Sequence, residues 1–94
     1  MKIFPEEREA TLKMVQNPNT WPYPVLPVKK RKENDFPDTG IISIGDLYPI
    51  KIYVDVNLFM LPKTKEEWKK IENNPNNLTF NTVEEMLEAG WIVD

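Results

Sequence analysis

The stretch IKIYVDV, residues 50–56, decides the expected fold because it is the clearest strand pattern in the chain. Its four aliphatic residues alternate with Lys51, Tyr53 and Asp55, so a pleated strand places the two sets on opposite faces. We expect the aliphatic face to be buried and the face of Lys51 and Tyr53 to be exposed to solvent. One buried and one exposed face are typical of an antiparallel sheet.

Two further strands are expected on the N-terminal side of this stretch. Ile41–Ile44 is a short apolar run, and residues 45–49 form a hairpin-sized loop that leads into the clearest strand. Val25–Val28 is expected to be an edge strand, because Pro27 has no N–H to donate to a neighbouring strand. Residues 36–40, FPDTG, have the composition of a turn.

Helices are expected on both sides of the strand region. Pro5–Gln16 begins with a proline and two glutamates, which favour the first turn of a helix, and it ends at an Asn-Pro pair. Residues 64–67, TKEE, and 82–85, TVEE, are capping boxes that each start a short helix. Gly90 is placed to end the second of these helices in a left-handed conformation.

The predicted architecture is a single α+β domain that spans residues 1–94. It consists of a small antiparallel sheet of about three strands, an N-terminal helix and two short C-terminal helices, and residues 91–94 have the composition of a short terminal strand. A chain of 94 residues suffices for one domain with one modest core. The composition, 40% apolar and 29% charged, is that of a globular protein rather than a disordered one.

The chain contains no cysteine and no histidine. Thiolate catalysis and cysteine-ligated metals are therefore excluded, and the commonest general base and neutral metal ligand are missing. The lack of cysteine also favours a reducing compartment. No apolar run reaches the roughly 18 residues that a membrane-spanning helix needs. We therefore expect a cytoplasmic protein that does not contact a membrane.

Carboxylates are the remaining candidates for acid–base catalysis. The glutamates of residues 66–67 and 84–88 are better explained as helix caps, dipole partners and solvated helix faces. The aspartates in the expected turns do not have the spacing of a calcium loop, and the three glycines are isolated, so no phosphate-binding loop is present. We expect no catalytic residue, metal or cofactor, and therefore a non-enzymatic function.

A basic run, KKRK, occupies residues 29–32. It follows Trp21 and Tyr23, and cations close to aromatic rings suit the binding of single-stranded nucleic acid. Four positive charges on a chain with a net charge of −3 are, however, a weak electrostatic footprint for nucleic acid. Nucleic-acid binding through this run is therefore an alternative hypothesis.

Aromatic residues are numerous for a domain of this size, with three Trp, three Tyr and four Phe. Most are expected in the core, and any that stay exposed would mark an interface, since Trp and Tyr are enriched at binding hot spots. A further alternative is an oligomer that traps a small ligand between its subunits. The candidate interface residues are Trp21, Tyr23, Lys29, Lys30, Arg31, Lys32, Tyr48, Lys51 and Tyr53.

Three short motifs carry a resemblance to a known group of proteins. They are WP at residues 21–22, LPVKK at residues 26–30 and GWIVD at residues 90–94. In this order they resemble the outline W-P…L-P-V-K-[KR]…G-W-x-V-D of small bacteriophage-encoded proteins of unknown function. The resemblance covers residues 20–94 and implies a phage protein in a bacterial cytoplasm. It assigns a role to no residue.

The function expected from the sequence is the binding of another protein without catalysis. In the context that the resemblance implies, the chain would be a phage accessory factor that binds and modulates or inhibits a host protein. The expected partner is a host or phage protein, with nucleic acid and self-association as the alternatives.

Overall fold

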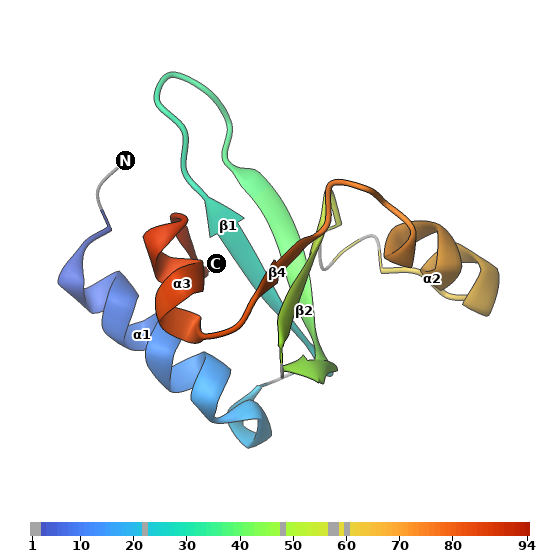
Figure 1. The fold of residues 1–94 in the computed structure, drawn as a ribbon, viewed down its shortest axis with the longest axis horizontal. Helices are drawn as coiled ribbons and strands as arrows, with labels where there is room; N and C mark the ends of the chain where they lie inside the picture. The colour runs from blue at the N-terminus through green and yellow to red at the C-terminus, as the bar shows by residue number, and fades with distance from the viewer. Residues whose placement is uncertain (1–2, 22, 48, 57–58, 60) are drawn as a thin grey trace.

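The computed structural model describes residues 3–21, 23–47, 49–56, 59 and 61–94 (Figure 1). Within these residues the class is α+β, as the sequence predicts, with three α-helices and one short 3₁₀ helix. The helices are α1 (Pro5–Gln16), η1 (Pro18–Thr20), α2 (Lys65–Glu72) and α3 (Val83–Glu88).

The described strands form one antiparallel sheet in the order β4-β3-β2-β1-β5. The prediction of about three strands is therefore wrong, because five strands pair within the described part of the chain. β4 and β5 contain three residues each, too few for an alternating pattern to show in the sequence. Both form by pairing with the longer strands β3 and β1. The strands are β1 (Val25–Lys30), β2 (Asp38–Leu47), β3 (Ile50–Val54), β4 (Leu78–Phe80) and β5 (Trp91–Val93).

Strand β1 is an interior strand, so its prediction as an edge strand is also wrong. It pairs with β2 on one side and with β5 on the other. The carbonyl oxygen of Pro27 accepts a hydrogen bond from the backbone N–H of Asp94, at 3.0 Å. In an antiparallel sheet the N–H and the C=O of one residue point toward the same neighbouring strand. For Pro27 that neighbour is on the β5 side, so its missing N–H removes no hydrogen bond between β1 and β2.

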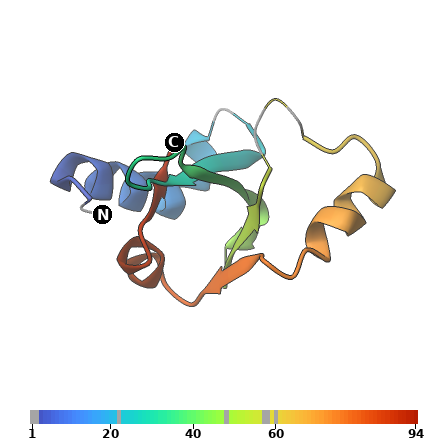
Figure 2. The ribbon, with the colours of Figure 1, turned by 90° about the horizontal axis from the view of Figure 1, so that it is seen from above.

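Helices lie on both sides of the sheet (Figure 2). On the side of α1 and α3, the larger cluster of buried side chains includes Met86, Trp91 and Ile52. On the side of α2, the half-buried Trp68 and Ile71 pack against a smaller cluster of four buried side chains. That second cluster consists of Val25, Ile41, Tyr53 and Val56.

Strand β3 is consequently covered on both faces, and the expectation of a solvent-exposed face is wrong. Tyr53 points to the α2 side and is only 4% exposed. The alternation of residues 50–56 also stops early, because Asp55 adopts the left-handed conformation with a φ of 60°. Val56 therefore packs with Tyr53, whereas Ile50 and Ile52 lie in the cluster on the opposite side.

The outer edge of β5 is covered by α1 through one side chain. Thr11 is fully buried, and its hydroxyl donates to the carbonyl oxygen of Glu7 at 2.8 Å. The hydroxyl oxygen of Thr11 in turn accepts the backbone N–H of Val93 at 3.0 Å. A β5 donor that would otherwise lie open at a sheet edge is thus satisfied by a helix, which protects this edge from pairing with other chains.

The predicted threonine caps are confirmed, but the glutamates of the two predicted capping boxes accept the N–H of the residue before each cap, Lys63 and Asn81, and not that of the threonine. The Thr64 hydroxyl accepts the N–H of Glu67, and the Thr82 hydroxyl accepts the N–H of Glu85, each at 3.2 Å. Gly90 follows α3 with a φ of 96°, a conformation that glycine adopts without steric cost. No helix among the described residues is long and apolar enough to cross a membrane.

Candidate protein-interaction surface

The aromatic residues proposed from the sequence lie in different environments. Trp21 and Tyr53 are buried, with 8% and 4% of their surface exposed. Tyr23 is half exposed, at 50%. Tyr48 lies outside the described residues. The described aromatic candidates therefore do not form one surface, and the indole N–H of Trp21 is directed inward, where it donates to the carbonyl oxygen of Met14 at 2.5 Å.

Tyr53 is held in the cluster beneath α2. Its hydroxyl donates to a carboxylate oxygen of Asp46 at 2.6 Å, and its ring makes an edge contact with Trp68 at a centroid distance of 6.3 Å. Lys51 also contacts the ring of Tyr53, with its Nζ 5.1 Å from the ring centroid. Burial and the hydrogen bond to Asp46 raise the pKa of the Tyr53 hydroxyl, so it stays protonated at neutral pH.

The basic run is largely neutralised by carboxylates. The Nζ of Lys29 lies 3.3 Å from Asp94, and the Nζ of Lys32 lies 2.8 Å from Asp38 across the base of the β1–β2 hairpin. The hydrogen bond and the charge of Asp38 raise the pKa of the Lys32 ammonium group. Lys30 has no ion pair within the described part of the chain.

Arg31 connects the start of the hairpin loop to the start of α1. Its two terminal nitrogens bind the two carboxylate oxygens of Glu7 at 2.8 and 2.7 Å, and its guanidinium carbon lies 5.3 Å from the ring centroid of Phe4. Partial burial acts to raise the pKa of the Glu7 carboxyl, but hydrogen bonds from Arg31 and from the Phe4 backbone outweigh it, and the net pKa is lowered. A two-point pair of this kind fixes orientation as well as distance.

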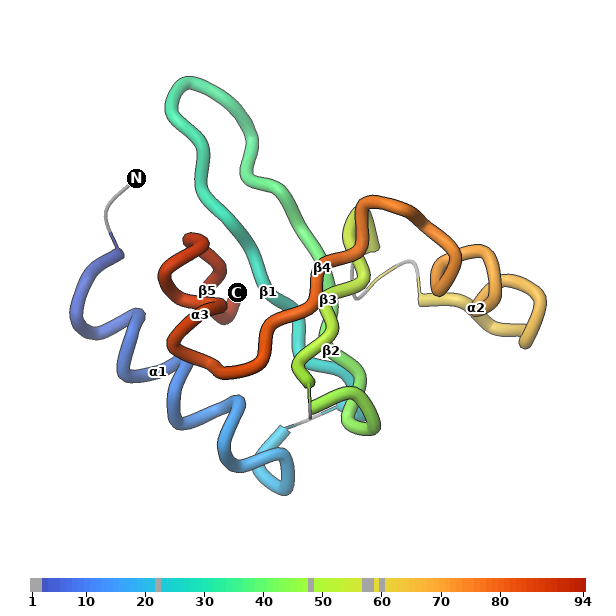
Figure 3. The backbone as a smooth tube through the Cα atoms, viewed as in Figure 1, coloured from blue at the N-terminus to red at the C-terminus, as the bar shows by residue number. Residues whose placement is uncertain are grey.

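The β1–β2 connection, residues 31–37, is here called the hairpin tip. Its backbone rises beyond the rest of the molecule (Figure 3). Asn34 takes the left-handed conformation with a φ of 56°, and the side chain of Asp35 accepts the backbone N–H of Phe36 at 2.7 Å. Phe36 follows this turn with 87% of its surface exposed. The hairpin tip therefore presents a phenyl ring to solvent from a base held by two ion pairs.

Phe36 was not among the residues proposed from the sequence, although a signal was present. It is the one aromatic residue in the polar segment KKRKENDFPDTG, residues 29–40. Most of the residues around Phe36 in the sequence are polar or charged, so they offer its ring little apolar surface to pack against. The enrichment of Trp and Tyr at interfaces pointed instead to Trp21 and Tyr53, which the fold buries.

Two glutamates of the predicted capping boxes accept backbone hydrogen bonds next to the helix starts. Glu67 and Glu85 accept backbone N–H groups one residue before each helix cap, from Lys63 at 2.7 Å and from Asn81 at 2.9 Å. No group of three or more His, Cys, Asp or Glu side chains in the described ranges could hold a metal ion. These glutamates therefore have structural explanations.

Comparisons with known proteins add no further assignment, since no protein-family model, no curated protein and no solved structure matches the chain.

Proposed function

We propose that the chain is a small non-enzymatic binding domain that contacts a partner protein with its hairpin tip. The observation that supports this most strongly is Phe36, a large apolar side chain exposed at 87% on a loop whose base is fixed. Burying a phenylalanine in a partner is worth roughly 1.5–3 kcal/mol, so one such residue can dominate a small interface.

The fixed base of the hairpin tip favours binding further. Arg31 is held by Glu7 and Phe4, and Lys32 is held by Asp38, so both ends of the tip are oriented before a partner arrives. Less conformational entropy is then lost on association, which strengthens binding without any new contact. In the phage context suggested by the sequence motifs, the partner we propose is a host protein, or another phage protein, whose activity the chain modulates.

Nucleic-acid binding is the less favoured function. Three of the four cations in the basic run have carboxylate partners among the described residues, so little positive charge is left to neutralise phosphates. Changing residues 29–32 to alanine should therefore leave any retention on single-stranded DNA as weak as in the wild type. A steep salt dependence that this change abolishes would favour the nucleic-acid function instead.

The direct test of the proposed function compares two aromatic substitutions at opposite ends of β1. Phe36→Ala removes the exposed ring of the hairpin tip, whereas Tyr23→Ala removes an exposed ring that precedes β1. Phe36→Ala should weaken capture of a specific protein from lysate of the source cells by about 10-fold or more, as expected for a hot-spot residue. Tyr23→Ala should leave the same capture unchanged.

The two variants also control for folding. Both residues are solvent exposed, so each variant should unfold within about 0.5 kcal/mol of the wild type. Equal capture by wild type and Phe36→Ala would contradict the proposed function. Loss of capture only in Tyr23→Ala would move the interface to the opposite end of the sheet.

A further inference from the structure

The side of the sheet that faces α2 presents an apolar surface, here called the covered face. It consists of the four buried side chains of the smaller cluster, Val25, Ile41, Tyr53 and Val56. Three of them belong to the adjacent strands β1, β2 and β3, and Val56 follows β3. The Tyr53 hydroxyl donates to Asp46 of β2, so it does not need a partner from α2. Exposing the covered face would therefore leave none of its side-chain polar atoms unpaired.

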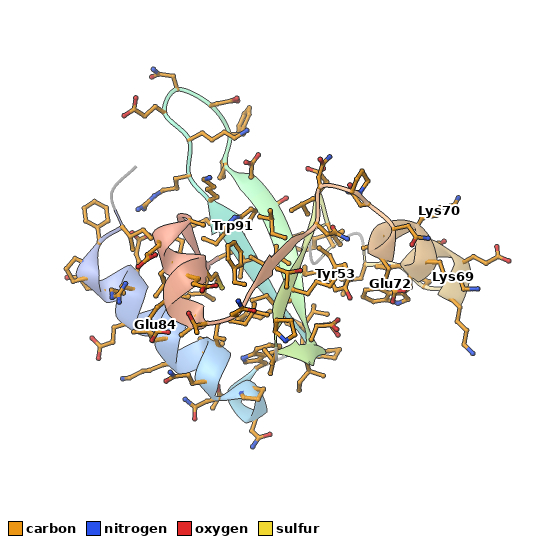
Figure 4. All side chains as sticks on the ribbon, viewed as in Figure 1. Tyr53, Lys69, Lys70, Glu72, Glu84 and Trp91 are labelled. Atoms are coloured by element: carbon orange, nitrogen blue, oxygen red, sulfur yellow. The ribbon has the colours of Figure 1, made fainter. Side chains whose placement is uncertain are left out.

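An amphipathic helix occupies the covered face in the free chain. Trp68 and Ile71 lie three positions apart, so they share one side of α2, and both pack against the covered face. Figure 4 shows Tyr53 between the sheet and α2, whereas Lys69 and Lys70 lie on the outer side of the helix. The structure thus shows which kind of ligand fits this surface, namely a helix with an aromatic and an aliphatic side chain on one side.

Helix α2 is weakly attached for a helix that covers a core cluster. It contains no buried residue, and the two side chains that reach the covered face are only partly buried. In the described part of the chain, no ion pair and no hydrogen bond joins α2 directly to a strand. Figures 1 and 2 show α2 at one side of the molecule, away from α1 and α3. We therefore expect α2 to open while the sheet stays folded.

We propose that the covered face is a second binding site, which accepts an amphipathic helix of a partner protein when α2 opens away from the sheet. α2 is then an autoinhibitory cover, because it occupies the site in the free chain and must leave before the partner helix binds. The affinity for the partner helix is reduced by the fraction of molecules in which α2 is open. This inference goes beyond the proposed function, since it uses no residue of the hairpin tip.

The test adds the α2 sequence as a separate peptide. A fluorescent peptide of residues 61–74 is titrated into the full chain that carries both Trp68→Ala and Ile71→Ala, here called the opened variant. These changes remove the two side chains that hold α2 on the covered face. Fluorescence anisotropy should show saturable binding of the peptide to the opened variant. Wild type should bind the peptide at least about 10-fold more weakly, because its own α2 competes for the same face.

Two controls show whether binding depends on the covered face. A peptide with alanine at positions 68 and 71 should not bind the opened variant. A full chain with Lys69→Ala, a change on the outer side of α2, should bind the original peptide as weakly as wild type does. In the opened variant, the peptide should shift the amide NMR signals of Ile41 and Tyr53 more than that of Trp91, which lies in the cluster on the opposite side.

Hydrogen exchange of β1 and β2 shows whether the sheet of the opened variant is still folded. Wild type offers a second measurement that needs no substitution. At low denaturant concentration, its α2 amides should exchange through an opening that leaves β1 and β2 protected. If the opened variant unfolds, this exchange in wild type decides the matter alone.

Three outcomes would overturn the inference. They are the absence of peptide binding by an opened variant with a protected sheet, equal binding by the opened variant and wild type, and exchange of the wild-type α2 amides only together with those of β1 and β2. A wild-type dimer that the opened variant does not form would assign the covered face to α2 of a second copy instead. Phe36→Ala should change none of these results, so the inference and the proposed function can fail independently.

Discussion

Arg31 and Glu7 make the most specific ion pair of the described residues, since two nitrogens meet two oxygens at 2.7 and 2.8 Å. About a quarter of each side chain is exposed, so solvent screens the pair only in part. The pair joins residues that lie 24 positions apart in the sequence. It therefore fixes the hairpin tip relative to α1, which local sequence alone would not do.

The pH dependence of stability should reveal this pair. The pKa of the Glu7 carboxyl is lowered in the folded state, so its stabilisation is complete above the ordinary pKa of a glutamate and is lost as pH falls through the lowered value. Glu7→Gln should cost about 1 kcal/mol at pH 7, and this difference from wild type should shrink toward zero near pH 3. Urea unfolding at the two pH values measures it.

Glu9→Gln is the matched control. Glu9 pairs with Lys13 at 3.8 Å on the same helix, but about three quarters of each side chain is exposed. Such a pair contributes about 0.3–0.5 kcal/mol at most. If Glu7→Gln and Glu9→Gln change the free energy of unfolding equally at both pH values, the pair between Arg31 and Glu7 stabilises the fold no more than an exposed ion pair does.

Thr11 gives a second prediction at the residue scale. Thr11→Val keeps the shape of the side chain but removes the oxygen that accepts the N–H of Val93. A buried donor without a partner costs about 1–3 kcal/mol, so the midpoint of thermal unfolding should fall by several degrees. Thr79→Val, on the exposed part of β4, should be neutral or slightly stabilising. Equal stability of Thr11→Val and wild type would contradict this role.

At the element scale, α2 differs from the α-helices α1 and α3 because it contains no buried residue. It is attached to the sheet through Trp68 and Ile71, and through Asn77. The Asn77 amide donates to the carbonyl oxygen of Ile71 at 2.7 Å and accepts the N–H of Val54 at 3.1 Å. A helix with so little burial is expected to open at a lower free energy than the sheet.

Hydrogen exchange should show this separation. In Trp68→Ala the edge contact with Tyr53 is lost, so the amides of α2 should exchange at least about 10-fold faster while those of β1 and β2 keep their protection. Lys69→Ala, on the exposed part of the same helix, should leave both sets unchanged. Equal acceleration in α2 and β1 would show that the helix and the sheet open as one unit.

The sequence predicts the elements that carry local signals. The helix of residues 5–16 and the two capped helices follow from proline, threonine and glutamate at defined positions, and the left-handed Gly90 follows from its place after a helix. β5 lies in residues 91–94, whose composition indicates a short terminal strand, but β4 carries no such signal, because three residues pair only where a longer strand is available. The burial of Tyr53 beneath α2 also depends on a tertiary contact, with Trp68, so local sequence patterns do not predict it.

At the scale of the whole molecule, the same limit applies to the candidate site. Sequence proximity grouped Trp21 and Tyr23 with the basic run, but the fold buries Trp21 and pairs three of the cations with acids among the described residues. The acids belong to α1, to β2 and to the residue after β5. Only the three-dimensional structure brings these charges together and shows that Phe36 is exposed at the hairpin tip.

The central claim, that the chain binds a partner protein through the hairpin tip, is tested most directly by photocrosslinking from single positions. A photoreactive phenylalanine analogue is placed at Phe36 in one variant and at Tyr23 in another, and both are irradiated in the source cells. We predict a discrete adduct with another protein from position 36 and none from position 23. An adduct of twice the chain mass would show that the hairpin tip contacts a second copy of the chain instead. Adducts from position 23 alone, or from neither position, would contradict the claim.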